Sequence, residues 1–253
     1  FQRTVSLSEI VNKALKNWYW FGISLFVFLC VGALYLLSTS PVYHREETVL
    51  IKDARRGVAA SELSAFADIA GISTRRSVDN ELYILQARRL MMEVADRLNL
   101  TVNYQIKSGL RTNTLYKNSP LDIAFVDDLG GKGCSFLVLI GEEGVTISKF
   151  ETSRLNKSDA EADKKFEATA KYGEVISLPI GQIVVNQSLY MSNEYVGKEI
   201  KVRKSSREST ATAYRNKVKM NVASKMSSIT NLSLNDVVPQ RAEDVLNTLL
   251  DVY

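Results

Sequence analysis

The segment that decides the fold is Trp18–Leu37, which reads WYWFGISLFVFLCVGALYLL and carries no charge over 20 residues. A helix of about 20 residues spans the ~30 Å hydrocarbon layer of a bilayer. Its 11 Leu, Ile, Phe and Val residues contribute roughly −3 to −7 kcal/mol of insertion free energy. Trp18 and Trp20 stand at the first boundary, where aromatic rings anchor membrane helices. We therefore predict a transmembrane helix over residues 18–38.

A cleavable signal peptide is the alternative for this segment, because the small residues Ser38–Ser40 follow it. The apolar run is longer than the usual signal-peptide core of about 7–15 residues. The preceding residues also have helical features, since Val5–Ile10 contains a Ser-x-x-Glu capping box. We predict an amphipathic helix over residues 1–17 that lies along the cytoplasmic surface of the membrane.

The basic residues on the two sides of this span are nearly balanced in number. They are Arg3, Lys13 and Lys16 before it, and Arg45, Lys52, Arg55 and Arg56 after it. Lys13 and Lys16 lie closer to the bilayer than any basic residue downstream, and long domains cross membranes largely regardless of charge. We expect residues 1–17 inside the cell and residues 39–253 outside the cytoplasmic membrane.

Composition excludes several classes of function. With 45% hydrophobic residues in 253, the chain can bury a sizeable core. Its net charge of +4 is spread along the length, so no basic stripe indicates nucleic acid. Cys30 and Cys134 lie far apart, which argues against a disulfide. His44 has no second ligand at metal-binding spacing, so we expect no metal and no cofactor.

The sequence also lacks the motifs of an enzyme. It contains no nucleophile elbow, no HExxH and no GxxxxGK[ST] phosphate loop. Gly130–Gly133 superficially resembles a phosphate cradle, but the Ser or Thr after the lysine is missing and a strand follows, so we interpret it as a loop. The acidic pairs Glu46–Glu47 and Glu142–Glu143 fit a strand and a solvated turn better than glycoside chemistry. We expect no catalytic residues.

Short apolar runs bounded by turn residues predict a sheet-rich centre after the membrane segment. The expected strands are Thr48–Ile51, Leu121–Val126, Cys134–Ile140, Val145–Phe150, Val175–Leu178, Ile183–Val185, Lys217–Ala223 and Ile229–Leu234. Helical spacing predicts helices over Glu81–Leu100, Pro239–Tyr253 and, more weakly, Ala59–Ala70. The fold class is therefore α+β: a transmembrane helix followed by a mixed α/β domain with a strand-rich insertion over residues 127–216.

Three segments in this order resemble the Wzz-type chain-length determinants, also called polysaccharide co-polymerases. The first is the membrane helix with Ser40–Tyr43 and the strand Glu47–Ile51. The second is the helix Val78–Leu90, and the third is the strand from Ile229 followed by Pro239–Glu243. Residues 127–216 depart from the smaller members and are similar to the larger capsule and exopolysaccharide types, some of which carry a cytoplasmic tyrosine kinase.

This resemblance implies a non-enzymatic protein of the bacterial inner membrane with a periplasmic domain over residues 39–253. Its implied role is to regulate the chain length of a surface polysaccharide (capsule, exopolysaccharide or the O antigen of lipopolysaccharide) and to support its export. The implied partners are other copies of the chain in a ring, the polymerase and export proteins, the lipid bilayer and the growing polysaccharide. The chain stops at Tyr253 within a helical pattern, so we expect it to continue into a second membrane helix.

Two other classes stay open on the sequence. One is the periplasmic ectodomain of a membrane sensor receptor, which should continue past Tyr253 into a membrane helix and a signalling helix pair. The other is a periplasmic adaptor of a transport system, which should show a lipoyl-like hairpin motif.

The helix Glu81–Leu100 carries more charge than its burial requires. One interpretation is a solvated face with weak ion pairs along the helix. The other is a subunit interface formed by Glu81, Arg88 and Arg89, which in a closed ring would face a different surface of the next copy.

Overall fold

The computed structural model describes residues 16–50, 80–126, 133–152, 166–179, 181–222 and 229–253. The chain divides into two compact units. The first unit contains residues 1–40 together with Ser108–Thr112, and the second contains the rest. The predicted surface helix over residues 1–17, apart from its last two residues, and the predicted helix Ala59–Ala70 lie outside the described residues.

In the first unit, helix α2 covers Trp18–Ser38 and none of its residues is buried. Its bounds match the predicted span. Its leucines favour the helical conformation, and no proline interrupts it. The helix ends at Thr39, whose backbone is extended and whose N–H and hydroxyl both donate to the Tyr35 carbonyl.

Two sheets that belong to the second unit, apart from the turn residues Ser108–Thr112, share one core. The larger sheet has the order β3 (Arg111–Leu115), β2 (Val102–Ser108), β10 (Glu199–Lys204), β5 (Cys134–Ile140), β6 (Gly144–Thr152) and β7 (Glu167–Lys171). The smaller has the order β4 (Leu121–Phe125), β9 (Gly181–Gln187) and β8 (Val175–Leu178). Alternate residues of β5, β4 and β9 point into the common core, as strands with one buried face require. A short 3₁₀ helix, η1 (Asn193–Tyr195), precedes β10.

The turn predicted at Gly141–Gly144 is confirmed as the hairpin between β5 and β6. The Gly141 N–H donates to the Gly144 carbonyl at 2.8 Å. A Cβ at Gly144 would lie 2.3 Å from the carbonyl oxygen of Ala170 on β7, so this close approach of two backbones requires glycine.

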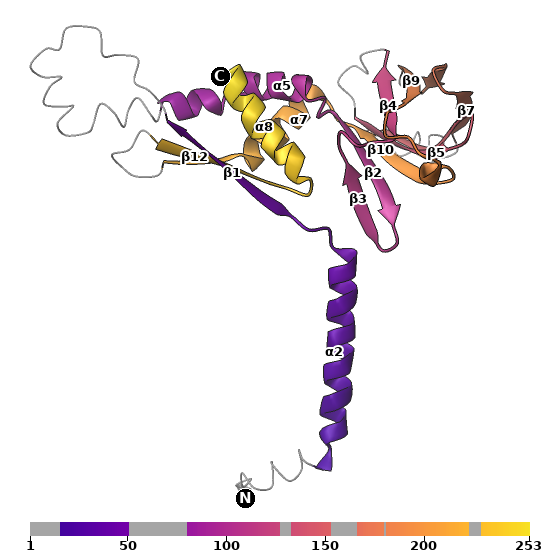
Figure 1. Cartoon of the computed structure of the whole chain (residues 1–253), viewed down its shortest axis with the longest axis vertical. Helices are drawn as coiled ribbons and strands as arrows, with labels where there is room; N and C mark the ends of the chain where they lie inside the picture. Colours follow the sequence, from indigo (N-terminus) through magenta and orange to yellow (C-terminus); the bar gives the residue numbers. More distant parts are fainter. Residues whose placement is uncertain (1–15, 51–79, 127–132, 153–165, 180, 223–228) are drawn as a thin grey trace, which may run out of the picture. The chain divides into compact units, whose positions relative to one another are not determined.

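A second core lies between a small sheet and three helices. The sheet has the order β1 (Tyr43–Leu50), β12 (Ile229–Asp236) and β11 (Lys219–Val222), and both pairings are antiparallel. The helices are α5 (Arg88–Arg97), α7 (Arg207–Lys217) and α8 (Pro239–Val252). Helix α8 packs on β12 and β1, while α5 packs on α7 and α8, as Figure 1 shows. Pro239 occupies the first turn of α8, where its fixed φ suits a helix start.

These elements confirm a mixed α/β protein with one apolar N-terminal helix and strand-rich sheets. Every expected strand has a counterpart, although β1 begins at Tyr43 rather than at Thr48. The strand expected from Lys217 begins at Lys219, because α7 continues to Lys217. Helix α7 and the strands β2, β3, β7 and β10 were not predicted.

The prediction of one continuous helix over Glu81–Leu100 is wrong. Residues 80–85 are helical, but Ala87 is extended (ψ 132°) and α5 starts after it. Leu85 and Met91 are both buried at 1% exposure. On an unbroken helix, positions six apart differ in direction by about 120°. The break at Ala87 turns both side chains into the same core.

Tyr104 joins the two sheets of the larger core. Its hydroxyl, on β2, accepts a hydrogen bond from the Ile123 N–H on β4 at 3.1 Å. Burial raises the pKa of Tyr104 to about 12, although the Ile123 bond lowers it. The folded state therefore holds this proton more tightly than the unfolded state, whose tyrosines titrate near pH 10. The stability that this contributes is complete below about pH 10 and is lost as the pH rises towards about 12.

We predict that Tyr104→Phe lowers the free energy of unfolding by about 1–3 kcal/mol at neutral pH, because the buried Ile123 N–H loses its acceptor. Chemical denaturation of the detergent-solubilised chain measures this. The slope of stability between pH 10 and about 12 should also become shallower than in the wild type. The exposed Tyr190 provides the control, since Tyr190→Phe removes no buried contact. Equal effects of the two substitutions would contradict the assigned role.

Candidate functional site

Helix α2 has the length and apolarity of a membrane span. Its mean hydropathy reaches 2.3 over 18 residues, and no part of that window is buried in the protein. Trp18 and Trp20, the predicted anchors, are 69% and 63% exposed. So large an uncovered apolar surface is unfavourable in water and suits a hydrocarbon environment.

The C-terminal end of α2 is capped by a residue far away in the sequence. Arg111 donates from Nε to the Leu37 carbonyl at 2.9 Å and from Nη2 to the Leu36 carbonyl at 2.8 Å. The last four carbonyls of a helix lack intrahelical donors, and a cation there also complements the helix dipole. Near a bilayer, where water is scarce, leaving such carbonyls unpaired is especially costly.

A further hydrogen bond tightens the same end. The Ser40 hydroxyl donates to the Thr112 carbonyl at 2.9 Å. Thr39 is also bonded to Tyr35, so hydrogen bonds fix both residues that follow the helix, Thr39 and Ser40. Sequence reasoning missed Arg111, because it lies 74 residues from Leu37 and no local pattern links the two.

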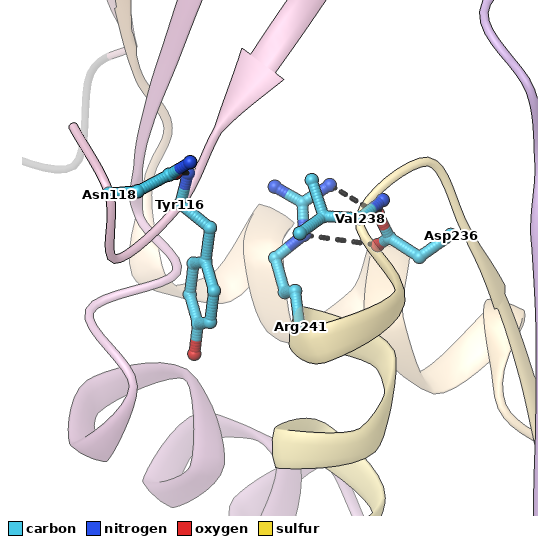
Figure 2. A network of polar contacts seen from close by, with 5 residues as sticks. All are labelled: Tyr116, Asn118, Asp236, Val238 and Arg241. Atoms are coloured by element: carbon cyan, nitrogen blue, oxygen red, sulfur yellow. Dashed lines mark hydrogen bonds and ion pairs between the residues drawn. The ribbon is translucent and has the colours of Figure 1, made fainter.

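A buried ion pair lies where β12 meets α8, in the segment that carries the third part of the family resemblance. Asp236 is 3% exposed and Arg241 is 6% exposed. Arg241 donates from Nε to Oδ2 of Asp236 at 3.1 Å and from Nη2 to Oδ1 at 2.5 Å. Oδ1 also accepts from the Val238 N–H at 2.9 Å. The bidentate geometry, drawn in Figure 2, locks the turn between strand and helix.

Two tyrosines surround this pair. Burial disfavours the charged guanidinium of Arg241, but the hydrogen bond with Asp236, together with the electrostatic interactions with Tyr214, Asp236 and Tyr116, outweighs it, so the pKa of Arg241 is raised. Burial raises the pKa of Tyr214, on α7, to about 12. Burial, and then the negative charge of Asp244, raise the pKa of Tyr116. Both tyrosines therefore stay neutral at physiological pH.

Residues 116–118 connect the segment after β3 to this network. Lys117 forms an ion pair with Asp244 of α8 at 2.7 Å. The Tyr116 N–H donates to Asn118 Oδ1 at 3.2 Å, which shapes the turn that carries both side chains. Figure 2 shows Tyr116 and Asn118 on one side of Arg241, with Asp236 and Val238 on the other. The network thus links α8 to the chain that leaves the larger sheet.

We predict that Arg241→Met lowers the free energy of unfolding by about 3–5 kcal/mol, because it leaves the Asp236 carboxylate buried without its counter-charge. The double variant Asp236→Asn/Arg241→Met should lose less than the sum of the single losses, measured in a denaturation cycle. Arg97→Met is the control. It removes only the exposed Glu93–Arg97 pair (3.0 Å), which is worth at most about 0.5 kcal/mol. Additive losses at Asp236 and Arg241 would contradict the coupling.

The residues predicted for a subunit interface lie in different surroundings. Glu81 is half-buried and its carboxylate accepts a hydrogen bond from the Tyr253 hydroxyl. Burial and then this contact raise the pKa of Tyr253 to about 12. Arg88 and Arg89 are both exposed in the first turn of α5. The structure therefore leaves the two arginines accessible but ties Glu81 to the end of α8.

Other charges of α5 already have partners in the chain. Glu93 pairs with Arg97 on the same helix, as the solvated-face interpretation expects. Asp96 instead pairs with Arg207 at the start of α7, so this contact joins two helices.

The described residues contain no group of three or more His, Cys, Asp and Glu side chains placed to hold a metal ion. His44 contacts Asn235 Oδ1 through Nδ1 at 2.7 Å, across the β1–β12 pairing. Cys30 lies exposed on α2, whereas Cys134 is buried in the larger core. Burial raises the pKa of the Cys134 thiol to about 11, which makes it a poor nucleophile.

A cavity of about 630 Å³ opens beside the polar network. Tyr104, Tyr116, Asn99, Gln187, Lys117 and Arg241 are among the residues that line it. Aromatic rings and amides of this kind suit a neutral polar ligand better than a metal ion.

Comparison with known proteins supports one class. Residues 3–98 match the family model described as Wzz, chain length determinant protein. These residues include α2 and β1, and the match confirms the resemblance to the Wzz-type family that the motifs predict. This part of the chain is therefore similar to the Wzz chain-length determinants, and the match supports a role in determining polysaccharide chain length.

None of the curated proteins compared with the chain matches it. Among solved structures, the crystal structure of Xanthomonas campestris FlgL in space group H3 is similar at 12% identity and a TM-score of 0.23. The similarity covers 60% of this chain and 46% of that one. So low a TM-score carries no argument about fold or function.

Proposed function

We propose that this protein is a polysaccharide co-polymerase, anchored in the bacterial cytoplasmic membrane by α2 with its main domain in the periplasm. In this role it regulates the chain length of a surface polysaccharide and supports its export. The observation that carries the proposal is the Wzz match over residues 3–98, which joins the apolar helix to the first strand of the domain.

The proposed mechanism is protein association rather than catalysis. Wzz proteins regulate chain length without being enzymes, and the polar network of this chain fits that role. Asp236 and Arg241 bind each other inside the core, so their charges hold the fold. Copies of the chain would form a ring beside the polymerase. The growing polymer is a further proposed partner. The lining of the cavity beside Tyr116 suits a neutral sugar.

Arg88 and Arg89 support the association mechanism. They stand in the first turn of α5, which contains no acidic residue and has no side-chain cap. The positive end of the helix dipole disfavours cations there by about 0.3–1 kcal/mol each. Helix stability therefore does not explain them, whereas an acidic surface on a neighbouring copy would. Glu81 contributes to the same proposed interface by holding Tyr253 at the end of α8.

Loss of the gene should shift the polymer to a shorter and broader length distribution, and a plasmid copy should restore it. Electrophoresis of the extracted polysaccharide measures this. A distribution that stays the same without the gene would contradict the proposed function.

Reporter fusions that are active only in the cytoplasm should be silent when joined after Phe150, and activity there would contradict the proposed topology.

We predict that the double variant Arg88→Glu/Arg89→Glu folds normally but broadens or shifts the polymer length distribution, because like charges then meet at every subunit contact. Purified particles should also be smaller than those of the wild type in size-exclusion chromatography. Lys171→Glu/Arg203→Glu is the matched control, because it reverses two exposed cations of the larger sheet. If both double variants assemble normally and give the wild-type distribution at equal abundance, α5 presents a solvated face.

A further inference from the structure

The turn between β2 and β3 exposes an apolar side chain between cations. Leu110 is 67% exposed, and Gly109 before it has φ +61°, the left-handed conformation that a tight turn requires. Lys107 and Arg111 flank the turn, and Lys107 is exposed. An apolar tip flanked by basic residues is the pattern of a segment that enters the boundary between lipid headgroups and acyl chains.

The position of this tip is set by Arg111. The Arg111 guanidinium contacts the carbonyls of Leu36 and Leu37 at 2.8 and 2.9 Å. Ser40, two residues after the helix end, also bonds to Thr112, so two hydrogen bonds fix the turn to the last turn of α2 and a third fixes it to the chain that follows. Residues 108–112 belong to the same compact unit as α2. Leu110 is adjacent to Arg111 in the chain, so its backbone is tied to the helix end through the Arg111 side chain.

We propose that the β2–β3 turn, residues 107–111, is a second membrane contact of this protein. The inference rests on the proposed membrane span of α2, because the last turn of a spanning helix lies at the boundary of the hydrocarbon layer. Leu110 then enters the outer edge of the acyl region. Arg111 uses two of its five N–H donors on α2, which leaves three for lipid phosphates, and Lys107 adds a second cation. The occupant of this surface is the bilayer that α2 crosses.

The test uses the full chain in liposomes of phosphatidylcholine and phosphatidylglycerol. The background is Cys30→Ala, and Cys134 can stay because it is buried and its pKa is raised. Leu110→Cys carries an environment-sensitive fluorophore, and spin-labelled lipids and aqueous iodide serve as quenchers. Leu37→Cys tests the end of α2 directly. Leu189→Cys, at a fully exposed position, calibrates quenching by iodide.

We expect the Leu110 label to lose fluorescence with spin-labelled lipids to nearly the extent of the Leu37 label, and to resist iodide relative to the Leu189 label. If Leu37 is quenched by lipid while Leu110 responds only to iodide, the turn faces water and the inference is wrong, although the membrane span stands. If Leu110 is shielded from both quenchers, protein covers it, and the inference is again wrong. If Leu37 itself is not quenched by lipid, the proposed membrane span fails first.

Discussion

The buried pair of Asp236 and Arg241 is the interaction on which the second core depends. This core lies between the β1–β12–β11 sheet and the helices α5, α7 and α8. The pair closes the turn between the central strand β12 and helix α8, and each of the two buried charges neutralises the other. Strand β12 pairs on one side with β1, the strand that follows the apolar helix α2 in sequence, and on the other with β11. Helix α8 in turn packs against α5. A loss of this pair therefore affects elements from both ends of the chain.

The elements predicted correctly are those whose apolar pattern and boundaries are visible within a short stretch of sequence. Cys134–Ile140 and Val175–Leu178 are apolar strands with turn residues at their ends, and α8 has a proline start and a regular apolar face. Helix α2 follows from length and apolarity alone. Strand β10 was missed because charged residues alternate with only two buried positions, Ile200 and Val202.

The functional contacts were harder to predict, because they join residues distant in sequence. Arg111 caps a helix 74 residues away, and Lys117 pairs with Asp244 of α8. The hydrophobic periodicity of a sequence does not indicate which distant residues will pair. Helix α7 was missed for another reason: its buried face consists of Thr210, Ala211 and Tyr214, which carry a weak apolar signal. No glycine or proline near Ala87 predicts the break in the helix there, and only the burial of Leu85 and Met91 accounts for it.

The second core should therefore unfold as one cooperative unit, distinct from the core shared by the six-stranded sheet and the β4–β9–β8 sheet. Native-state hydrogen exchange of the full chain with increasing denaturant tests this most directly. The amides of β1, β12 and α8 should exchange through one common opening with the same free energy and denaturant dependence, whereas those of β5 and β6 should follow a separate one. If β1 opens at much lower free energy than α8, the Asp236–Arg241 turn does not hold the strand that follows α2, which contradicts a single cooperative unit.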